Sequence, residues 1–347
     1  MSTYKKYFDG LRGVAIISVI IYHANINIFN YKLFSGGYLG VDIFFVISGY
    51  LITFVIVNDF EKNKKFSILN FADKRIRRIF PVLILIIIFF YLPFFFNLVP
   101  SSFNAYLKST NSIFLFNTNF HFNDVNQVYG DDSSLEKPFL HIWSIAIEFQ
   151  FYAFTSILFF LLFKIKSNIN FYILILILIF LFSIIYCQIN YKINPTSNFY
   201  LPFGRLWEFI FGALLFLIEK KKFINFDTKI TRHLPLLGFI IISICLLTFK
   251  KNSPHPSLLT IIPVFSLGLI ILFNKPKEII NRLLNFIILL KIGIISYSLY
   301  ILHYPIFALV RVVVAKTDHI FFLSLVKLSL PIILISFSVL SYYFVER

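Results

Sequence analysis

The stretches PVLILIIIFFYLPFFFNLV (81–99) and NFYILILILIFLFSIIYC (170–187) decide the fold class, because each is almost entirely apolar over the length of a membrane span. An α-helix rises about 1.5 Å per residue, so roughly 20 apolar residues cross the ~30 Å hydrocarbon core. The whole chain of 347 residues has the same character, with 59% hydrophobic residues, 47 Phe and a mean hydropathy of +0.83. We therefore predict an all-α polytopic membrane protein and exclude an ordinary soluble domain.

The apolar pattern predicts about ten membrane-spanning helices, and the basic residues predict their orientation. Of the Lys and Arg residues in the connections, 21 fall on one side of the membrane and 8 on the other. Positive residues concentrate in cytoplasmic loops, so both termini are expected in the cytoplasm. The net charge of +16 follows from this topology and does not indicate nucleic-acid binding. The expected helices lie at 11–30, 39–58, 80–99, 142–163, 170–189, 200–218, 234–249, 257–273, 292–310 and 320–343.

Residues 1–347 are expected to form one transmembrane domain. Lys5 and Lys6 precede the first apolar run as in a signal peptide, but no small-x-small cleavage site follows, so the run is expected to remain as the first helix. Cys187 and Cys245 both lie inside apolar runs, where cysteine usually packs as a small apolar residue. They predict neither a disulfide framework nor a metal site.

The first predicted helix contains two residues that are costly in lipid. In FDGLRGVAIISVIIYHANIN (8–27), Arg12 stands near the start and His23 lies eleven residues further on. At about 100° and 1.5 Å per residue, both side chains project from nearly the same face, ~16 Å apart along the axis. Imidazole has an unperturbed pKa near 6.5 and suits a general base, whereas a hydrogen-bonded packing residue is the alternative. The spacing alone does not choose between them.

Two other helices are expected to place polar residues at a similar depth. HIWSIAIEFQFY (141–152) runs inward from His141 and carries Glu148 about 10 Å below the outer boundary, while SYSLYILHYPIF (296–307) carries His303 about 16 Å above the inner one. For Glu148 and His303 a purely structural hydrogen bond or ion pair remains the alternative.

Two arginine motifs are open to two interpretations. In FADKRIRRIFP (71–81), Arg75 and Arg78 share one face of a helix and could bind phosphates by charge-assisted hydrogen bonds, or could contact anionic lipid headgroups. In GRLWEF (204–209), Arg205 and Glu208 are spaced for an intrahelical ion pair that we interpret as structural.

Taken together and in this order, these motifs resemble the acyltransferase 3 family of bacterial integral-membrane enzymes that modify cell-surface glycans. The resemblance covers nearly the whole chain. It rests on FDGLRGVAIISVIIYH (8–23), GGYLGVDIFFVISGYLIT (36–53), RIRRIFP (75–81), HIWSIAIEFQFY (141–152), FGRLWEFIFGALL (203–215), ISYSLYILHYPIF (295–307) and SYYFVER (341–347).

The resemblance implies transfer of an acyl group, most often acetyl, from cytoplasmic acyl-coenzyme A across the inner membrane to a sugar hydroxyl. It implies Arg12 and His23 as the essential pair of the first helix and Arg75 and Arg78 as contacts for the coenzyme A phosphates, with weaker support for Glu148, Arg205 and His303. From their charge and depth, we expect His23 and Glu148 to be catalytic and Arg12 to bind the donor with Arg75 and Arg78. No metal is implied. Some relatives continue into a periplasmic SGNH-type domain, which is not expected in a chain ending at Arg347. Candidate supporting residues are Asp9, His141, Trp143, Arg205 and His303.

Several questions remain open at this level. His23 could act as a general base towards the sugar hydroxyl or form a covalent acyl-histidine intermediate. The acceptor could be O-antigen, capsule, exopolysaccharide, peptidoglycan, another lipid-linked glycan or a small glycoside. The main alternative function is a transporter or flippase for a glycan or lipid-linked sugar, because charges inside the membrane also mark transport pathways.

Overall fold

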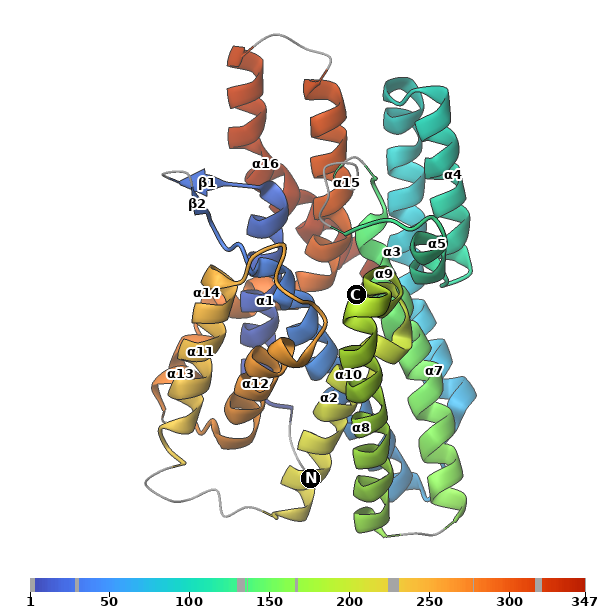
Figure 1. Cartoon of the computed structure of the whole chain (residues 1–347), viewed down its shortest axis with the longest axis vertical. Coiled ribbons are helices and arrows are strands. Elements are labelled where there is room, and N and C mark those ends of the chain that lie inside the picture. Colours follow the sequence, from blue (N-terminus) through green and yellow to red (C-terminus); the bar gives the residue numbers. More distant parts are fainter. Residues whose placement is uncertain are drawn as a thin grey trace. The chain divides into compact units, whose positions relative to one another are not determined.

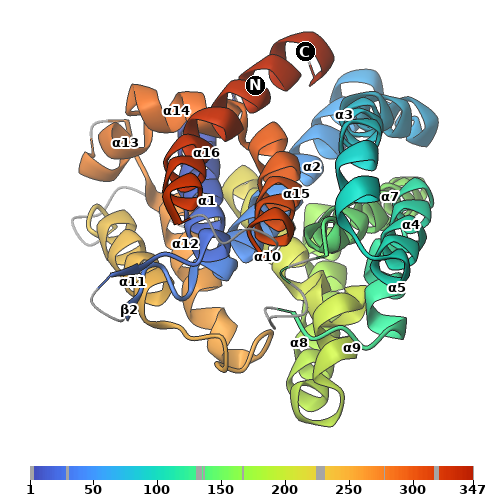
Figure 2. The same cartoon turned by 90° about the horizontal axis from the view of Figure 1, so that it is seen from above.

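A computed structural model describes residues 4–28, 31–129, 135, 137–165, 168–223, 231–276, 278–315 and 320–346 of the chain. The chain divides into two compact units that are each built from separate stretches of sequence. The first comprises Met1–Phe71 and Glu148–Ile294, and the second comprises Ala72–Ile147 and Ile295–Arg347. Their described parts are almost entirely helical (Figures 1 and 2).

The first unit holds most of the helices and one short hairpin. The two strands pair antiparallel, with Asn27 opposite Lys32. The elements are α1 (Tyr7–Ala24), β1 (Asn27–Ile28), β2 (Tyr31–Lys32), η1 (Gly37–Leu39), α2 (Gly40–Asn63), most of α7 (Trp143–Lys164), α8 (Ile169–Ile193), α9 (Pro195–Tyr200), α10 (Pro202–Lys221), α11 (Leu234–Thr248), η3 (Leu258–Thr260), α12 (Ile261–Phe273), α13 (Ile279–Leu284) and α14 (Ile287–Ile294).

Helices α2 and α10 cross at glycines in the first unit, and Figure 1 shows them side by side. A Cβ on Gly49 would lie 1.9 Å from the carbonyl oxygen of Phe209, and one on Gly212 would lie 2.0 Å from that of Val46. The two backbones therefore touch where only hydrogen fits. Such small-residue contacts drive helix association in lipid, where the hydrophobic effect between helices is absent.

Glycines also fix α1 against α13 and α14. A Cβ on Gly10 would meet the carbonyl oxygen of Leu284 at 1.9 Å, and one on Gly13 would meet that of Leu289 at 2.5 Å. From the other side, a Cβ on Gly293 would lie 1.7 Å from the carbonyl oxygen of Asp9. The helix that carries Arg12 and His23 is thus packed by backbone contact along its first half.

The second unit contains a long helix, an outer pair of helices and the C-terminal helices. Rings from α3 and α4 contact each other, for example Phe94 and Tyr106 with centroids 5.4 Å apart. Tyr297 at the start of α15 donates to the carbonyl of Ile79 in α3 at 2.8 Å. The elements are α3 (Ile68–Asn97, whose first residues belong to the first unit), α4 (Pro100–Phe114), α5 (Thr118–Asp124), η2 (Leu140–Ile142), the first turn of α7, α15 (Ser296–Val314), α16 (Ile320–Ser341) and a terminal π-helical turn, η4 (Tyr342–Glu346).

Seven of the described helices are long and apolar enough to cross a membrane, so the mainly helical, multi-pass fold agrees with the prediction. Every expected span overlaps a described helix, but α11 and the segment Leu258–Phe273 are shorter than a full span. The number of ten spans stays a prediction. So does the cytoplasmic position of the termini, because residues 1–3 and 347 lie outside the described residues. The seven segments are Gly37–Asn63, Ile68–Asn97, Leu140–Lys164, Ile169–Ile193, Pro195–Lys221, Ser296–Val314 and Ser329–Glu346.

Two boundaries differ from the expected ones. Helix α3 begins at Ile68 and runs through Pro81, which was expected near the helix start, because a membrane helix tolerates a proline at the cost of one backbone hydrogen bond. Residues 100–141, expected as a connection, contain α4, which starts with Pro100 and buries Tyr106 and Ile113. Residues 130–134 and 136 of this connection lie outside the described residues.

Candidate active site

Arg12 lies in the second turn of α1 and is paired within its own helix. Its Nη1 is 3.2 Å from Asp9 Oδ1 and 3.2 Å from the hydroxyl oxygen of Tyr4, which donates to the same carboxylate at 2.6 Å. The Arg12 side chain remains about one-fifth exposed, at 21%. Asp9, expected only as a supporting residue, therefore balances the charge of Arg12 without covering it.

His23 lies in the last turn of α1 and is buried. Its ring meets that of Tyr22 edge-on, with centroids 5.2 Å apart. Arg12 and His23 lie in one uninterrupted α-helix. The two residues therefore project from nearly the same face of α1, ~16 Å apart along its axis, as predicted from their spacing. Asn25, in the left-handed conformation, ends the helix two residues later.

Glu148 accepts hydrogen bonds from two hydroxyl groups in the first unit. Ser48 Oγ of α2 donates to Glu148 Oε1 at 2.5 Å, and the Tyr152 hydroxyl one turn further along α7 donates to the same oxygen. The carboxylate is thus held between α2 and α7. Neither Ser48 nor Tyr152 was singled out in the sequence, although both lie within the quoted motifs.

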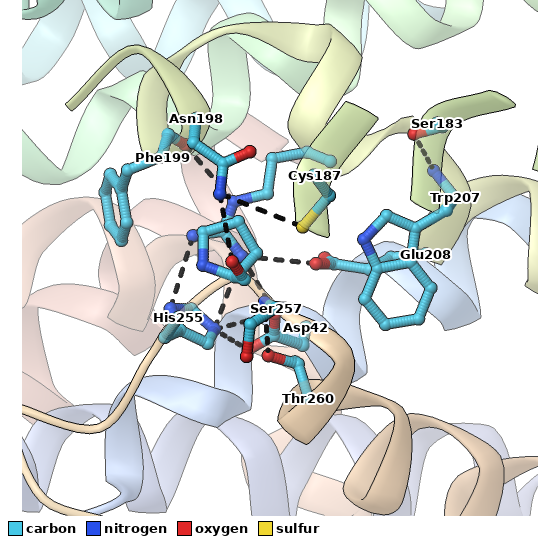
Figure 3. Close-up of polar contacts among 12 residues, drawn as sticks. Asp42, Ser183, Cys187, Asn198, Phe199, Trp207, Glu208, His255, Ser257 and Thr260 are labelled. Carbon is cyan, nitrogen blue, oxygen red and sulfur yellow. Dashed lines mark hydrogen bonds and ion pairs between the residues drawn. The ribbon is translucent and has the colours of Figure 1, made fainter. Parts of the chain in front are cut away.

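Arg205 belongs to a buried cluster of charged side chains, of which Figure 3 labels Asp42, Glu208 and His255. Its Nη1 donates to Asp42 Oδ1 of α2 at 3.0 Å and to Glu208 Oε1 at 3.2 Å, and all three side chains are at most 1% exposed. His255, in the segment before η3, donates from Nε2 to Asp42 Oδ2 at 3.0 Å. The expected Arg205–Glu208 contact is present, whereas Asp42 and His255 are additional members of the cluster.

The surroundings of His255 favour its neutral form. Burial lowers the pKa of His255 below its ordinary value, and the Arg205 guanidinium acts in the same direction, while Asp42 partly opposes both. Arg205 Nη2 lies 3.5 Å from Nδ1, which can accept when Nε2 carries the hydrogen, and Arg205 Nη1 lies 3.3 Å from Nε2. Both ring nitrogens are therefore engaged within the cluster.

In the second unit, Arg75 and Arg78 lie on one face of α3, as their spacing predicts. Arg78 Nη2 is 3.7 Å from Glu346 Oε1 of η4, and the arginine remains 47% exposed. The neighbouring Arg77 pairs instead with Asp73 one turn earlier, with Nε to Oδ1 at 2.8 Å. The geometry leaves Arg78 accessible to an anionic ligand.

His141, Trp143 and His303 also belong to the second unit and are buried. His141 Nε2 donates to the carbonyl of Ile301 at 3.1 Å, and its ring lies 5.2 Å from that of His303. His303 Nδ1 donates to the carbonyl of Tyr300 at 2.6 Å. The contacts of His141 tie η2 to α15, and the supporting roles expected of the three residues stay predictions.

The predicted site residues are thus divided between the units: Arg12, His23, Glu148 and Arg205 lie in the first, and Arg75, Arg78, His141 and His303 lie in the second. Within the first unit Arg12 is paired with Asp9 and Arg205 with Asp42. In the described part of the chain, no group of three or more His, Cys, Asp or Glu residues is placed to hold a metal ion.

Comparison with known proteins shows to which family the chain belongs. The model of an acyltransferase domain, acyltransferase 3, matches residues 5–342. The chain belongs to the acyltransferase 3 family. It is therefore a multi-pass membrane protein of this family, as its apolar helices also indicate.

Curated relatives include the peptidoglycan O-acetyltransferase OatA of Listeria monocytogenes, 27% identical over 91% of this chain and 51% of that protein. The O-acetyltransferase OatA of Staphylococcus aureus is 30% identical over 89% of this chain and 51% of that protein. The acyltransferase 3 chain thus spans about half the length of these relatives. No solved structure matches it significantly.

Proposed function

We propose that the chain transfers an acetyl group from cytoplasmic acetyl-coenzyme A to a hydroxyl of a cell-wall glycan on the outer side of the bacterial cytoplasmic membrane. The observation that carries the proposal is α1 itself. One rigid helix presents a partly exposed cation, Arg12, near its start and a buried imidazole, His23, near its end. In a chain of this family, that arrangement suits a polyanionic donor entering from one side and an acceptor from the other.

The donor is proposed to bind through its phosphates to Arg12, Arg75 and Arg78. Guanidinium groups make bidentate, charge-assisted hydrogen bonds to phosphate oxygens. Arg78 is about half exposed and lies 3.7 Å from Glu346 Oε1, and Ser298 donates to the other oxygen of Glu346, so a phosphate can replace that partner while Glu346 keeps a hydrogen bond. Asp9 keeps Arg12 in place while its guanidinium remains accessible.

His23 is proposed as the general base. The sugar hydroxyl loses its proton to His23 while its oxygen forms a bond to the acetyl carbon, the thioester C–S bond breaks, and His23 returns the proton to the coenzyme A thiolate. General-base catalysis of this kind contributes about 10²–10⁴-fold. Glu148, held by Ser48 and Tyr152, is proposed to balance the charge of the imidazolium.

Peptidoglycan is the acceptor best supported by the relatives. One of them is named for O-acetylation of peptidoglycan, and its identity with this chain extends over nearly the whole of the transmembrane part. Lipopolysaccharide O-antigen and capsule, also considered from the sequence, have no comparable support. We therefore propose a hydroxyl of the peptidoglycan sugars as the site of transfer.

The decisive variant is His23→Ala, assayed in purified full-length protein with radiolabelled acetyl-coenzyme A and peptidoglycan fragments. We expect the transfer of label to fall at least about 100-fold. The matched control is His233→Ala, because His233 is exposed at the start of α11 and should leave the rate unchanged. Thermal unfolding of both variants checks that the fold is intact.

Retention of transfer by His23→Ala contradicts the general-base role. Reconstituted vesicles separate the enzyme from the alternative function. If unmodified protein moves a labelled lipid-linked glycan across the bilayer without acetylating it, the chain is a flippase and the proposal is wrong.

A further inference from the structure

The cluster of Asp42, Arg205, Glu208 and His255 has a charge balance that requires a proton. Arg205 contributes one positive charge. Its guanidinium nitrogens lie 3.3 Å and 3.5 Å from the two ring nitrogens of His255, and this contact disfavours a second positive charge on the buried imidazole. With both Asp42 and Glu208 ionised, the cluster would have one negative charge in excess. The two acids are at most 1% exposed, and an uncompensated charge in such a place costs several kcal/mol.

The hydrogen bonds indicate where this proton lies. Asp42 accepts from Arg205 and from His255, so both of its oxygens are used by donors. Glu208 Oε1 accepts from Arg205, but no N–H or O–H group of the described residues reaches Glu208 Oε2, which is fully buried. A proton on Asp42 would compete with one of its two donors, whereas Glu208 Oε2 has room for one. The hydrogen bonds therefore favour Glu208 as the protonated acid.

The cluster is connected to the end of α1 that carries His23. The ring of Tyr38 lies 4.8 Å from that of His255 and 5.5 Å from that of Tyr22, the neighbour of His23. Tyr38 also donates to the carbonyl of Lys250 at 3.2 Å, which anchors the segment leading to His255. A Cβ on Gly37 would lie 2.2 Å from the carbonyl of Ser18, so η1 rests directly on α1.

The segment that carries His255 is also held by Asn198 of α9 (Figure 3). Asn198 donates to the carbonyl of Pro256 at 2.9 Å, next to His255, and lies 3.8 Å from the sulfur of Cys187. The His255 segment is thus held by the charge cluster on one side and by Asn198 on the other. Loss of the cluster's hydrogen bonds would release it from α2 and α10.

We propose that Glu208 carries a structural proton, and that the neutral Asp42–Arg205–Glu208–His255 cluster is a positioning site that holds Tyr38 and the 250–257 segment against the His23 end of α1. The positioning role rests on the proposed acetyl transfer. The protonation of Glu208 does not. At alkaline pH the proton leaves, Glu208 and Asp42 repel each other, and the segment shifts. Besides Asp42 and Glu208, the titratable and charged groups of the described residues that face this site are Tyr38, Cys187, Arg205, His255 and, through Tyr38, Tyr22.

The protonation is tested by infrared spectroscopy on the purified full-length chain. Unmodified protein at neutral pH should show a protonated carboxyl band that is absent from Glu208→Gln. The matched control is Glu219→Gln, because Glu219 is partly exposed and paired with Lys5 at 2.5 Å, so the band should remain. A band that persists unchanged in Glu208→Gln overturns the proposal, whatever reaction the chain catalyses.

The positioning role is tested by the pH profile of acetyl transfer. Glutamine is neutral like protonated Glu208 and can accept the same hydrogen bond from Arg205, so Glu208→Gln should retain activity within about threefold at neutral pH. The unmodified chain should lose acetyl-transfer activity as the pH becomes alkaline, and Glu208→Gln should not show this loss. Asp42→Asn, which removes the charge that Arg205 needs, should lower activity about tenfold or more.

Glu208→Gln that is inactive at every pH, or that keeps the alkaline fall, overturns the positioning role. If the unmodified chain acetylates no glycan, the proposed function has failed, and the infrared result still decides where the proton lies.

Discussion

Gly212→Ala should separate α2 from α10 and destabilise the first unit. The added Cβ would lie 2.0 Å from the carbonyl oxygen of Val46 and 2.8 Å from the amide nitrogen of Tyr50, both backbone atoms that cannot rotate away. Even weak C–H···O contacts need about 3.3 Å or more, so the helices must move apart locally by about 1.3 Å. A gap of ~0.5–1 Å already forfeits a quarter to a half of the dispersion energy of each contact.

Overpacking of this kind costs about 1–3 kcal/mol, and the rigid backbone neighbours place Gly212→Ala at the upper end. For a unit of this size, each kcal/mol lowers the midpoint of thermal unfolding by about 2–4 °C, so we expect a decrease of roughly 6–12 °C. The assay is thermal unfolding in detergent, followed by intrinsic fluorescence. Acetyl transfer should fall in parallel at temperatures above the new midpoint.

Gly268→Ala is the matched control. Its Cβ would meet Cζ of Phe211 at 2.7 Å, which is the far end of a side chain that can shift. We expect Gly268→Ala to lower the midpoint much less than Gly212→Ala. If the two variants unfold at the same temperature, backbone contact between α2 and α10 does not determine stability, and the reasoning is refuted.

Three further predictions follow from single contacts. Arg78→Ala should raise the KM for acetyl-coenzyme A and lower the free energy of unfolding by less than about 1 kcal/mol, because the arginine is half exposed. Arg77→Ala, which removes an exposed i,i+4 ion pair with Asp73, should change neither the KM nor the stability, and steady-state kinetics compare the two variants. Because burial lowers the pKa of His255, this residue takes up a proton near pH 6.5 in the unfolded chain but only at lower pH in the folded chain. The unfolding temperature should therefore fall as the pH drops below about 6.5, and His255→Gln should remove the part of this fall that His255 causes. Glu148→Gln should retain the fold but lower kcat about tenfold or more, and an unchanged kcat would exclude Glu148 from charge balance.

The sequence predicted the helices better than their ends. Long apolar runs such as 170–187 leave helix as the only backbone structure that satisfies its polar groups in lipid, and α8 spans them. Pro81 was interpreted as a helix start, but α3 extends 13 residues before it, from Ile68. Proline is a reliable boundary in water and a weak one in a membrane helix. Helix α4 was missed because its residues are mixed in polarity, although Pro100 at its first turn is a start signal.

The candidate site was predictable only where the partners are close in sequence. The pair of Arg205 and Glu208 follows from i,i+3 spacing, and the structure contains it. Asp42 and His255 are 163 and 50 residues from Arg205 in sequence, so no local pattern pairs them. The available signals were an aspartate inside the apolar run GVDIFF (40–45) and a histidine between two prolines in SPHPS (253–257). A charge inside an apolar run implies a partner without naming it.

The glycine contacts of α1 restrict how any reaction or transport cycle can proceed. Gly10 and Gly13 touch carbonyl oxygens of neighbouring helices, and Gly293 touches the backbone of α1 from the opposite helix. Turning α1 by one residue, about 100°, would drive a side chain into those carbonyls, and sliding it by one residue would do the same. The helix therefore has a single register against α13 and α14. His23 therefore keeps a fixed position relative to α13 and α14, and in the mechanism proposed above the donor and the acceptor both move to it.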